Sequence, residues 1–168
     1  MKHFYLIFLT LLINFAESDA SLKKELSGIV IKISDGDTIT ILDSLNNTHR
    51  IRLYGIDCPE KGQDYFQVAK DYLGDLCFQK TVYIQIMHTD QYKRPVAKVY
   101  VDSLELNYLL LKEGLAWQYT AYDKSLHYQK AQEEAKIKKK NIWSLGNPIA
   151  PWEFRKTKRL KTLNKQSA

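Results

Sequence analysis

The sequence predicts a protein of the α+β class, in which a small barrel of five short strands carries about three helices. Short segments in the first half of the chain alternate side chains between two faces, as half-buried strands do. One segment in the middle and two later ones instead repeat apolar residues at helical spacing. The chain of 168 residues is long enough for one domain with a proper core and too short for two comfortable ones.

The first half of the chain predicts three strands. Residues 29–33, with isoleucine at every second position, indicate the first strand. A tight Asp-Gly turn leads to a returning strand over 38–42. The third strand covers 49–56, with Ile51 and Leu53 on one face. A proline shortly afterwards stops it, because proline cannot donate to a sheet ladder.

Residues 64–140 predict three helices and two further strands. Residues 64–78 form the clearest helix, and strands follow over 81–87 and 96–101. A short helix over 106–113 ends at a glycine C-cap, and a last helix runs over about 125–140. This order predicts a Greek-key barrel of the OB-fold type, a fold that commonly binds nucleic acids.

Residues 1–20 are typical of a secretory signal peptide. A short basic start precedes an almost wholly apolar run over 4–15, and small residues then place a cut after Ala20. The apolar run is too short to cross a bilayer comfortably. We therefore expect a secreted or periplasmic protein, with an uncleaved segment that anchors the chain in a membrane as the alternative.

The mature chain would hold one domain over 21–150 and a basic tail over 151–168. The net charge of the whole chain is +6, and removing one lysine and two acids with the first twenty residues raises it to +7. A basic exported domain favours polyanions: nucleic acid, anionic lipid or acidic polysaccharide. The tail has no acid after Phe154. It is either solvated and disordered or a weak electrostatic grip on a polyanion.

Two cysteines, Cys58 and Cys77, are compatible with one disulfide in an exported protein. Cys77 also falls on the apolar face of the helix predicted over 64–78. A buried free thiol explains it equally well, so both interpretations stay open.

Two carboxylates flank a rigid turn after the third strand. Asp57 and Glu60 enclose Cys58 and Pro59, and proline fixes the backbone there. Hard cations such as Ca²⁺ take oxygens from carboxylates, carbonyls and water. Asp37 and Asp57, with the carbonyl of Cys58, would make such a site, and a solvated acidic loop is the alternative.

Two arginines complete the set of charges. Arg52 lies mid-strand, off the face that Ile51 and Leu53 bury, so it needs an anionic partner or exposure. A structural salt bridge to one of the same acids is the alternative to a phosphate role. Arg94 stands in a polar turn, where a surface arginine is ordinary. Guanidinium groups match phosphate oxygens, so the whole set is suited to metal-assisted hydrolysis of a phosphodiester.

Four ordered motifs resemble those of the staphylococcal nuclease (thermonuclease) family, over roughly Leu26 to Ser144. They are Gly28-Ile-Val-Ile-Lys-Ile-Ser-Asp-Gly-Asp-Thr38, Arg52-Leu-Tyr-Gly-Ile-Asp-Cys-Pro-Glu60, Asp90-Gln-Tyr-Lys-Arg94 and Asn141-Ile-Trp-Ser144. The resemblance implies an endonuclease that cuts single-stranded or duplex DNA and RNA with little sequence preference and leaves 3′-phosphates. We expect a monomer with no stable protein partner.

The resemblance implies a role for each matching residue. Asp37, Asp57 and the carbonyl of Cys58 would bind Ca²⁺. Glu60 would orient or deprotonate the attacking water, and its effect must come from placement because a carboxylate is a weak base.

The remaining roles fall on arginines and tyrosines. Arg52 and Arg94 would bind the scissile phosphate and stabilise its transition state. Tyr92 and Tyr122 match positions where the family packs a nucleotide base or bonds a phosphate.

One departure from the family bears on function. The residue before the second arginine is usually glycine in the family and is Lys93 here. A turn that needs a positive φ would be strained by lysine. A non-catalytic nucleic-acid-binding module of the same fold is therefore the alternative to an enzyme.

Overall fold

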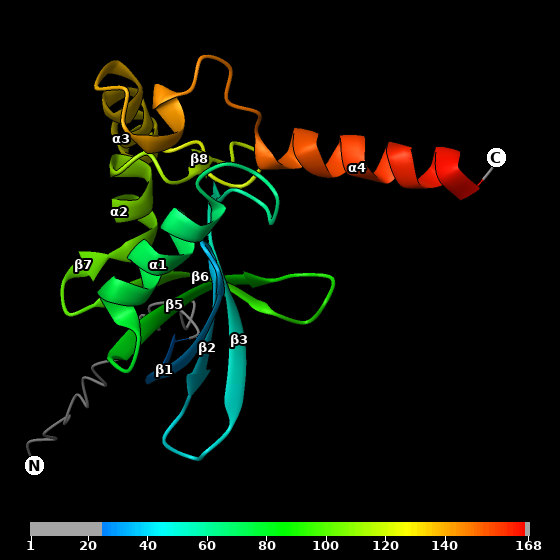
Figure 1. Cartoon of the computed structure of the whole chain (residues 1–168). Coiled ribbons are helices and arrows are strands. Elements are labelled where there is room, and N and C mark those ends of the chain that lie inside the picture. The colour runs from blue at the N-terminus through cyan, green and yellow to red at the C-terminus, as the bar shows by residue number, and fades with distance from the viewer. Residues whose placement is uncertain (1–24, 167–168) are drawn as a thin grey trace, which may run out of the picture.

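The computed structural model describes residues 25–166, so the predicted signal peptide lies outside the described residues. Within this range the α+β prediction is confirmed: a five-stranded barrel carries four α-helices, one more than expected (Figure 1). No described helix is both long enough and apolar enough to span a bilayer.

The barrel closes through one parallel contact. Antiparallel ladders join its strands in the order β3-β2-β1-β5-β6, and β3 then pairs with β6 through Arg52 opposite Val96 and Leu53 opposite Ala97. Closure brings the end of β3 close to the β5–β6 turn, where the second predicted arginine lies. The five strands are β1 (Glu25–Asp35), β2 (Thr38–Leu42), β3 (Thr48–Leu53), β5 (Thr81–Thr89) and β6 (Pro95–Val101).

The strand predicted over 49–56 is interrupted at Gly55. Gly55 has a φ of 72°, and an added Cβ would lie 2.7 Å from the Cβ of Asp123. The chain therefore turns, and β4 (Ile56–Asp57) pairs with β8 (Trp117–Gln118) instead of continuing β3. A further short strand, β7 (Leu104–Glu105), extends the edge at β6. The break at Gly55 is what directs Asp57 into a different sheet from Arg52.

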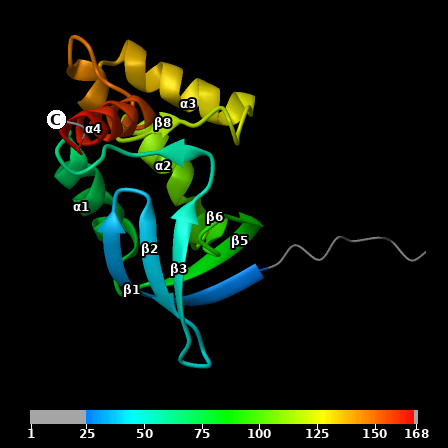
Figure 2. The same ribbon diagram turned by 90° about the vertical axis from the view of Figure 1, so that its right-hand side faces the viewer.

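The helices pack beside the barrel and over one end of it (Figures 1 and 2). Helix α1 buries the predicted face, including Cys77, and α3 begins with Ser125 as its N-cap. Both cysteines are buried and free, which favours the free-thiol interpretation. The helices are α1 (Phe66–Cys77), α2 (Leu106–Lys112), α3 (Leu126–Ile137) and α4 (Pro151–Gln166), with a 3₁₀ turn, η1 (Asn141–Ser144).

The basic tail forms a helix. Helix α4 holds 16 residues and projects away from the barrel as a rod (Figure 1). Its start packs against the rest of the protein: Pro151 is buried, and Trp152 joins a small apolar cluster with Trp117 and Ile142. This anchored start places α4 at the rim of the cleft described next.

Candidate active site

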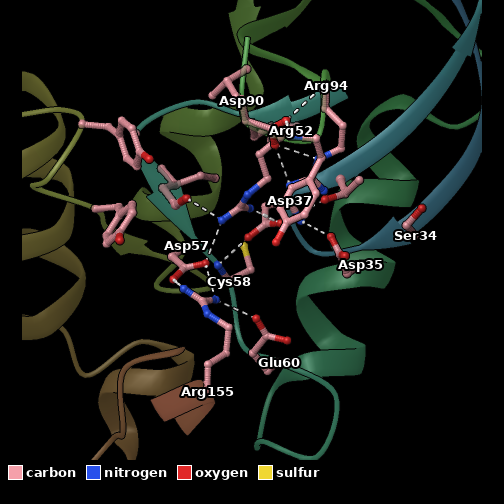
Figure 3. A pocket seen from close by; sticks show the side chains of 18 of the residues that line it. Ser34, Asp35, Asp37, Arg52, Asp57, Cys58, Glu60, Asp90, Arg94 and Arg155 are labelled. Carbon is pink, nitrogen blue, oxygen red and sulfur yellow. Dashed lines mark hydrogen bonds and ion pairs between the residues drawn. The ribbon is translucent and has the colours of Figure 1, made fainter. Parts of the chain in front are cut away.

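A cleft of about 840 Å³ opens where the β1–β2 turn, β4 and the β5–β6 turn meet the start of α4 (Figure 3). The structure brings all eight residues proposed for the site to this cleft, from separate parts of the chain. Their chemical roles remain predictions. The eight are Asp37, Arg52, Asp57, Cys58, Glu60, Tyr92, Arg94 and Tyr122.

Arg52 joins two buried carboxylates at the centre of the cleft. Its Nη2 donates to Asp57 Oδ1 at 2.7 Å and to the carbonyl of Ile56 at 3.3 Å, while Nη1 contacts Asp37 Oδ1. Asp37 and Asp57 are only 6% and 1% exposed, so their charges need such a partner. Burial lowers the pKa of Arg52, but the two carboxylates outweigh this and raise the pKa above its usual value. The salt bridge expected as an alternative role is therefore present.

The backbone at Cys58 ties the two acidic segments together. Its N–H donates to Asp37 Oδ2 at 2.7 Å, and its thiol donates to the carbonyl of Gly36 at 3.2 Å. Burial, followed by the charge of Asp37, raises the pKa of the Cys58 thiol well above its usual value. A thiolate ligand is thereby disfavoured, so a metal ligand from this residue would be its carbonyl oxygen.

Asp35 adds a further carboxylate behind Asp37. Its Oδ1 accepts a hydrogen bond from the N–H of Asp37 at 3.1 Å, which holds the β1–β2 turn in shape. Burial and the charge of Asp37 raise the pKa of Asp35 to about 6. Asp35 therefore holds its proton more readily than an exposed carboxyl group does.

Arg155, from the start of α4, reaches between Asp57 and Glu60 and was missed by the sequence analysis (Figure 3). Its Nη2 donates to Asp57 Oδ2 at 2.8 Å, and its Nη1 to Asp57 Oδ1 at 3.2 Å and Glu60 Oε1 at 2.6 Å. Burial raises the pKa of Asp57, and Arg155 and Arg52 oppose that shift. Asp57 is thus held by guanidinium groups on two sides.

The sequence contains a local signal for the helix but none for this contact. Residues 151–155 read Pro-Trp-Glu-Phe-Arg, and proline at the first helical position with an acid in the first turn is typical of a helix start. The ion pair to Asp57 spans 98 positions of the chain. Only the three-dimensional arrangement shows where the Arg155 side chain lies.

Glu60 lies at the exposed side of the cleft. Its N–H donates to Gln63 Oε1 at 2.9 Å, and Gln63 Nε2 donates to the carbonyl of Ile149 at 2.8 Å, so the loop is tied to the segment before α4. The side chain of Glu60 is 38% exposed. Solvent therefore reaches the carboxylate, as a group that activates water requires.

Arg94 lies in the β5–β6 turn and is held by Asp90. Asp90 Oδ1 accepts from the N–H of Arg94 at 2.9 Å, and Oδ2 accepts from Nε at 2.9 Å and pairs with Nη2 at 2.9 Å. The guanidinium carbon also lies 5.5 Å from the centroid of the Tyr92 ring. Within residues 25–166, Nη1 has no hydrogen-bond partner, and it is the donor left to meet a phosphate.

Lys93 takes the left-handed conformation expected of the glycine that it replaces. Its φ is 60°, a conformation that costs a residue with a Cβ about 1–2 kcal/mol. Backbone hydrogen bonds within the turn offset this cost. The N–H of Lys93 donates to the carbonyl of Asp90 at 2.9 Å, and the N–H of Asp90 donates to the carbonyl of Arg94 at 3.0 Å. Arg94 stays in the cleft despite the strain.

Aromatic rings form one wall of the cleft. Tyr122 stacks on His88 at 5.3 Å between centroids, and Tyr119 stacks on Trp152 at 5.4 Å. Tyr119 and Tyr122 are themselves in tilted contact at 5.2 Å. Tyr122 is 55% exposed and Tyr92 is 70% exposed. Both rings therefore offer area on which a nucleotide base can stack.

The carboxylate donors suit a hard cation. Asp37 and Asp57 carry oxygens of the kind that Ca²⁺ prefers. Within residues 25–166, however, no group of three or more His, Cys, Asp or Glu residues is gathered so that it could hold a metal ion. The guanidinium of Arg155 donates hydrogen bonds to both Asp57 and Glu60 and so supplies a positive charge beside them. The carboxylate oxygens of Asp57 and Glu60 therefore already bind one cationic group. A metal ion could bind them only after Arg155 had moved away.

Comparison with known proteins identifies the family of this chain. A family model described as "Staphylococcal nuclease homologue" matches residues 50–145, which is more than half of the chain. The chain belongs to the staphylococcal nuclease family. The expectation of an enzyme of this family is thereby confirmed.

Named relatives support the same family across most of the chain. An uncharacterized endonuclease of Haemophilus influenzae is 37% identical over 151 residues, which cover 90% of this chain and 85% of the relative. A micrococcal nuclease of Shigella flexneri is 34% identical and covers 77% of this chain and 80% of its own length. The staphylococcal-like nuclease CAN1 of Arabidopsis thaliana is 36% identical over 87% of this chain and 44% of its own length.

Proposed function

We propose that this staphylococcal nuclease family member is a Ca²⁺-dependent endonuclease that hydrolyses phosphodiester bonds of DNA and RNA, single-stranded or duplex. The observation that carries the proposal is the arrangement of charge in the cleft. Buried Asp37 and Asp57 lie beside a solvent-accessible Glu60, with Arg52 and Arg94 from two neighbouring parts of the barrel. Such a set binds a phosphate and activates a water in one place.

The arginines would act on the phosphate. Arg52 and Arg94 would donate to its non-bridging oxygens and stabilise the charge that develops there. Arg94 has a free donor in Nη1, whereas Arg52 must share donors with Asp37 and Asp57. Ca²⁺ bound by Asp37, Asp57 and the Cys58 carbonyl would polarise a phosphoryl oxygen.

Glu60 would act on the water. The water oxygen forms a bond to phosphorus while the bond to the 5′-oxygen breaks, and Glu60 accepts the proton that the water loses. The 5′-oxygen leaves and takes a proton from solvent, so the products end in a 3′-phosphate and a 5′-hydroxyl. Arg155 must leave Glu60 for this step, because the two side chains are paired at 2.6 Å.

Weak selectivity follows from what the cleft can recognise. Phosphates carry no sequence information, and stacking on Tyr92 and Tyr122 would tolerate any base. We therefore expect cleavage of both nucleic acids at many positions.

Replacing Glu60 by Gln tests the proposed chemistry. The variant keeps the side-chain volume and loses the base, so we expect kcat on DNA to fall by about 10²–10⁴-fold. Folding, measured by circular dichroism, and DNA affinity, measured in the presence of a chelator, should be unchanged. Glu153→Gln, an exposed glutamate at the start of α4, is the matched control and should retain full activity. Undiminished cleavage by Glu60→Gln would exclude the general-base role.

A non-catalytic nucleic-acid-binding module is the second candidate. The strained φ of Lys93 and the pairing of Arg155 with Asp57 and Glu60 favour it, because both features oppose an open catalytic arrangement. Tight DNA binding without cleavage in any divalent metal would support this candidate over the nuclease.

We also propose that the chain is exported, on the basis of the apolar run and small residues within 1–20. N-terminal sequencing of the exported protein should find a start near Ser21. An intact N-terminus in the membrane fraction would indicate the anchored form instead.

A further inference from the structure

Helix α4 begins at the rim of the cleft and leads away from it. Its first residues are fixed by Pro151, which is buried, by Trp152, which stacks on Tyr119, and by Arg155, which binds Asp57 and Glu60. From residue 155 to residue 164 every side chain is exposed. Figure 1 shows the helix as a rod that projects beyond the barrel. The site thus continues into an extended surface.

Four cations lie on residues 156–164 of this rod, and together they form what we call the cationic arm. None of them pairs with a carboxylate within residues 25–166, in contrast to Arg52, Arg94 and Arg155 in the cleft. No acid occurs anywhere after Glu153 to balance them. Their charge is therefore available to an anionic partner. The members of the arm are Lys156, Lys158, Arg159 and Lys161.

The arm is long enough to run beside several phosphates of a nucleic acid strand. Residues 156–166 would extend about 16 Å at 1.5 Å per residue. One strand of a duplex carries a phosphate every 3.4 Å or so, which gives about five phosphates along this length. A strand bound in the cleft at Arg155 therefore has several phosphates within reach of the arm.

We propose that the cationic arm binds the phosphate backbone of a nucleic acid strand where that strand leaves the cleft. This inference rests on the proposed function and deepens it, because it assigns long polynucleotides as preferred substrates. Contacts to phosphate add affinity without adding sequence selectivity. Short substrates, which end within the cleft, would gain nothing from the arm.

An anionic membrane surface fits the arm less well. A helix that lies on a membrane needs an apolar face opposite its cations. On α4 the exposed Leu160 and Leu163 share their side of the helix with Lys156, since positions four and seven apart align. Cations thus surround the rod, and an arm that starts beside Glu60 is placed to meet the substrate.

The test compares two triple variants with the same change in charge. The arm variant carries Lys156→Gln, Lys158→Gln and Lys161→Gln, and the control carries Lys112→Gln, Lys130→Gln and Lys139→Gln, exposed lysines that form no ion pair within residues 25–166. Glutamine preserves helix propensity. Circular dichroism should confirm equal helix content. Affinity is measured with a chelator present, on a 40-nucleotide DNA single strand, at several salt concentrations.

The arm variant should bind the long strand about tenfold more weakly than the control, and its salt slope should fall by about 2, or roughly 0.7 per lost phosphate contact. Its kcat/KM should fall on the long strand and stay unchanged on a p-nitrophenyl phosphodiester of one nucleotide. Equal affinity and slope for both triples would overturn the inference. Loss of binding only to phosphatidylglycerol vesicles would also overturn it, in favour of a lipid partner. Arm-dependent DNA binding by a wild-type chain that cuts nothing would reject the nuclease proposal while supporting the arm.

Discussion

At the residue scale, arginines and carboxylates are paired in the cleft. Two of the arginines, Arg52 and Arg155, therefore have both a structural and a proposed functional role. Arg52 stabilises two buried carboxylates and is also the proposed phosphate ligand. Arg155 occupies carboxylate oxygens of Asp57 and Glu60, so it would compete with a metal ion for them. A substitution at either arginine therefore changes folding, metal binding and catalysis to different extents, and measurements can separate them.

Replacing Arg52 by Lys should impair both stability and turnover. A single ammonium group cannot span Asp37, Asp57 and the carbonyl of Ile56. Because the charge is kept, we expect a loss of about 1–3 kcal/mol in unfolding free energy rather than the 3–5 of a fully broken pair. Turnover should fall by about 10²–10³-fold.

The control for this prediction is Arg50→Lys, an exposed arginine two residues earlier on β3. Urea unfolding and DNA cleavage should both be unchanged in that variant. Normal turnover together with lower stability in Arg52→Lys would show that Arg52 is purely structural.

Replacing Arg155 by Gln should strengthen Ca²⁺ binding. Asp57 and Glu60 would lose the cation that occupies their oxygens at 2.6–3.2 Å. We expect about tenfold tighter binding, the equivalent of one charged hydrogen bond, by isothermal titration without substrate. Arg159→Gln, one helical turn further along the exposed rod, should leave the affinity unchanged. Weaker Ca²⁺ binding in Arg155→Gln would mean that Arg155 supports the metal site rather than competing with it.

At the scale of elements, the limits of sequence prediction have identifiable causes. The β2 bounds and the buried face of α1 follow from periodicity and agree with the structure. The split between β3 and β4 does not, because it depends on the positive φ of Gly55 and on its close approach to Asp123, a residue distant in sequence. The basic composition of the residues after 154 predicts no helix or strand there. In the structure, contacts of Trp152 and Arg155 fix the start of α4, and the helix continues from that point.

The β2–β3 turn predicts a pH dependence of stability. Asp43 accepts hydrogen bonds from His49 Nε2 at 2.8 Å, from the N–H groups of Leu45 and Asn47, and from the Asn47 side chain. The His49 contact leads these in lowering the pKa of Asp43 to about 2. Because the folded-state pKa lies below the unfolded one, this stabilisation is present above about pH 4. It is lost as the pH falls towards 2.

Asp43→Asn should therefore lower the melting temperature at pH 6 by a few °C and match the wild type near pH 2. Thermal unfolding followed by circular dichroism at pH 6, 4 and 2 measures this. Asp75→Asn, an exposed carboxylate on α1, is the control. A deficit of the same size at every pH would show that the turn does not depend on the charge of Asp43.

At the scale of the molecule, barrel closure assembles the site. The parallel β3–β6 contact brings the strand of Arg52 to the turn of Arg94, and α4 returns Arg155 across 98 positions to Asp57. The eight proposed site residues come from the resemblance to the staphylococcal nuclease family rather than from the ends of predicted elements. The sequence allows a salt bridge of Arg52 to the acids of the site as an alternative, but it does not predict the pairing of Arg94 with Asp90, which depends on exact side-chain positions.

Cleavage of DNA by the purified mature chain, with Ca²⁺ and then with a chelator, tests the central claim most directly. Single-stranded and duplex DNA should both be cut, cutting should stop with the chelator and return with added Ca²⁺, and the fragments should end in 3′-phosphates. Cleavage that continues at full rate in the chelator would contradict a metal-assisted mechanism at Asp37, Asp57 and Glu60. Binding without cleavage in every divalent metal would contradict the assignment of a nuclease.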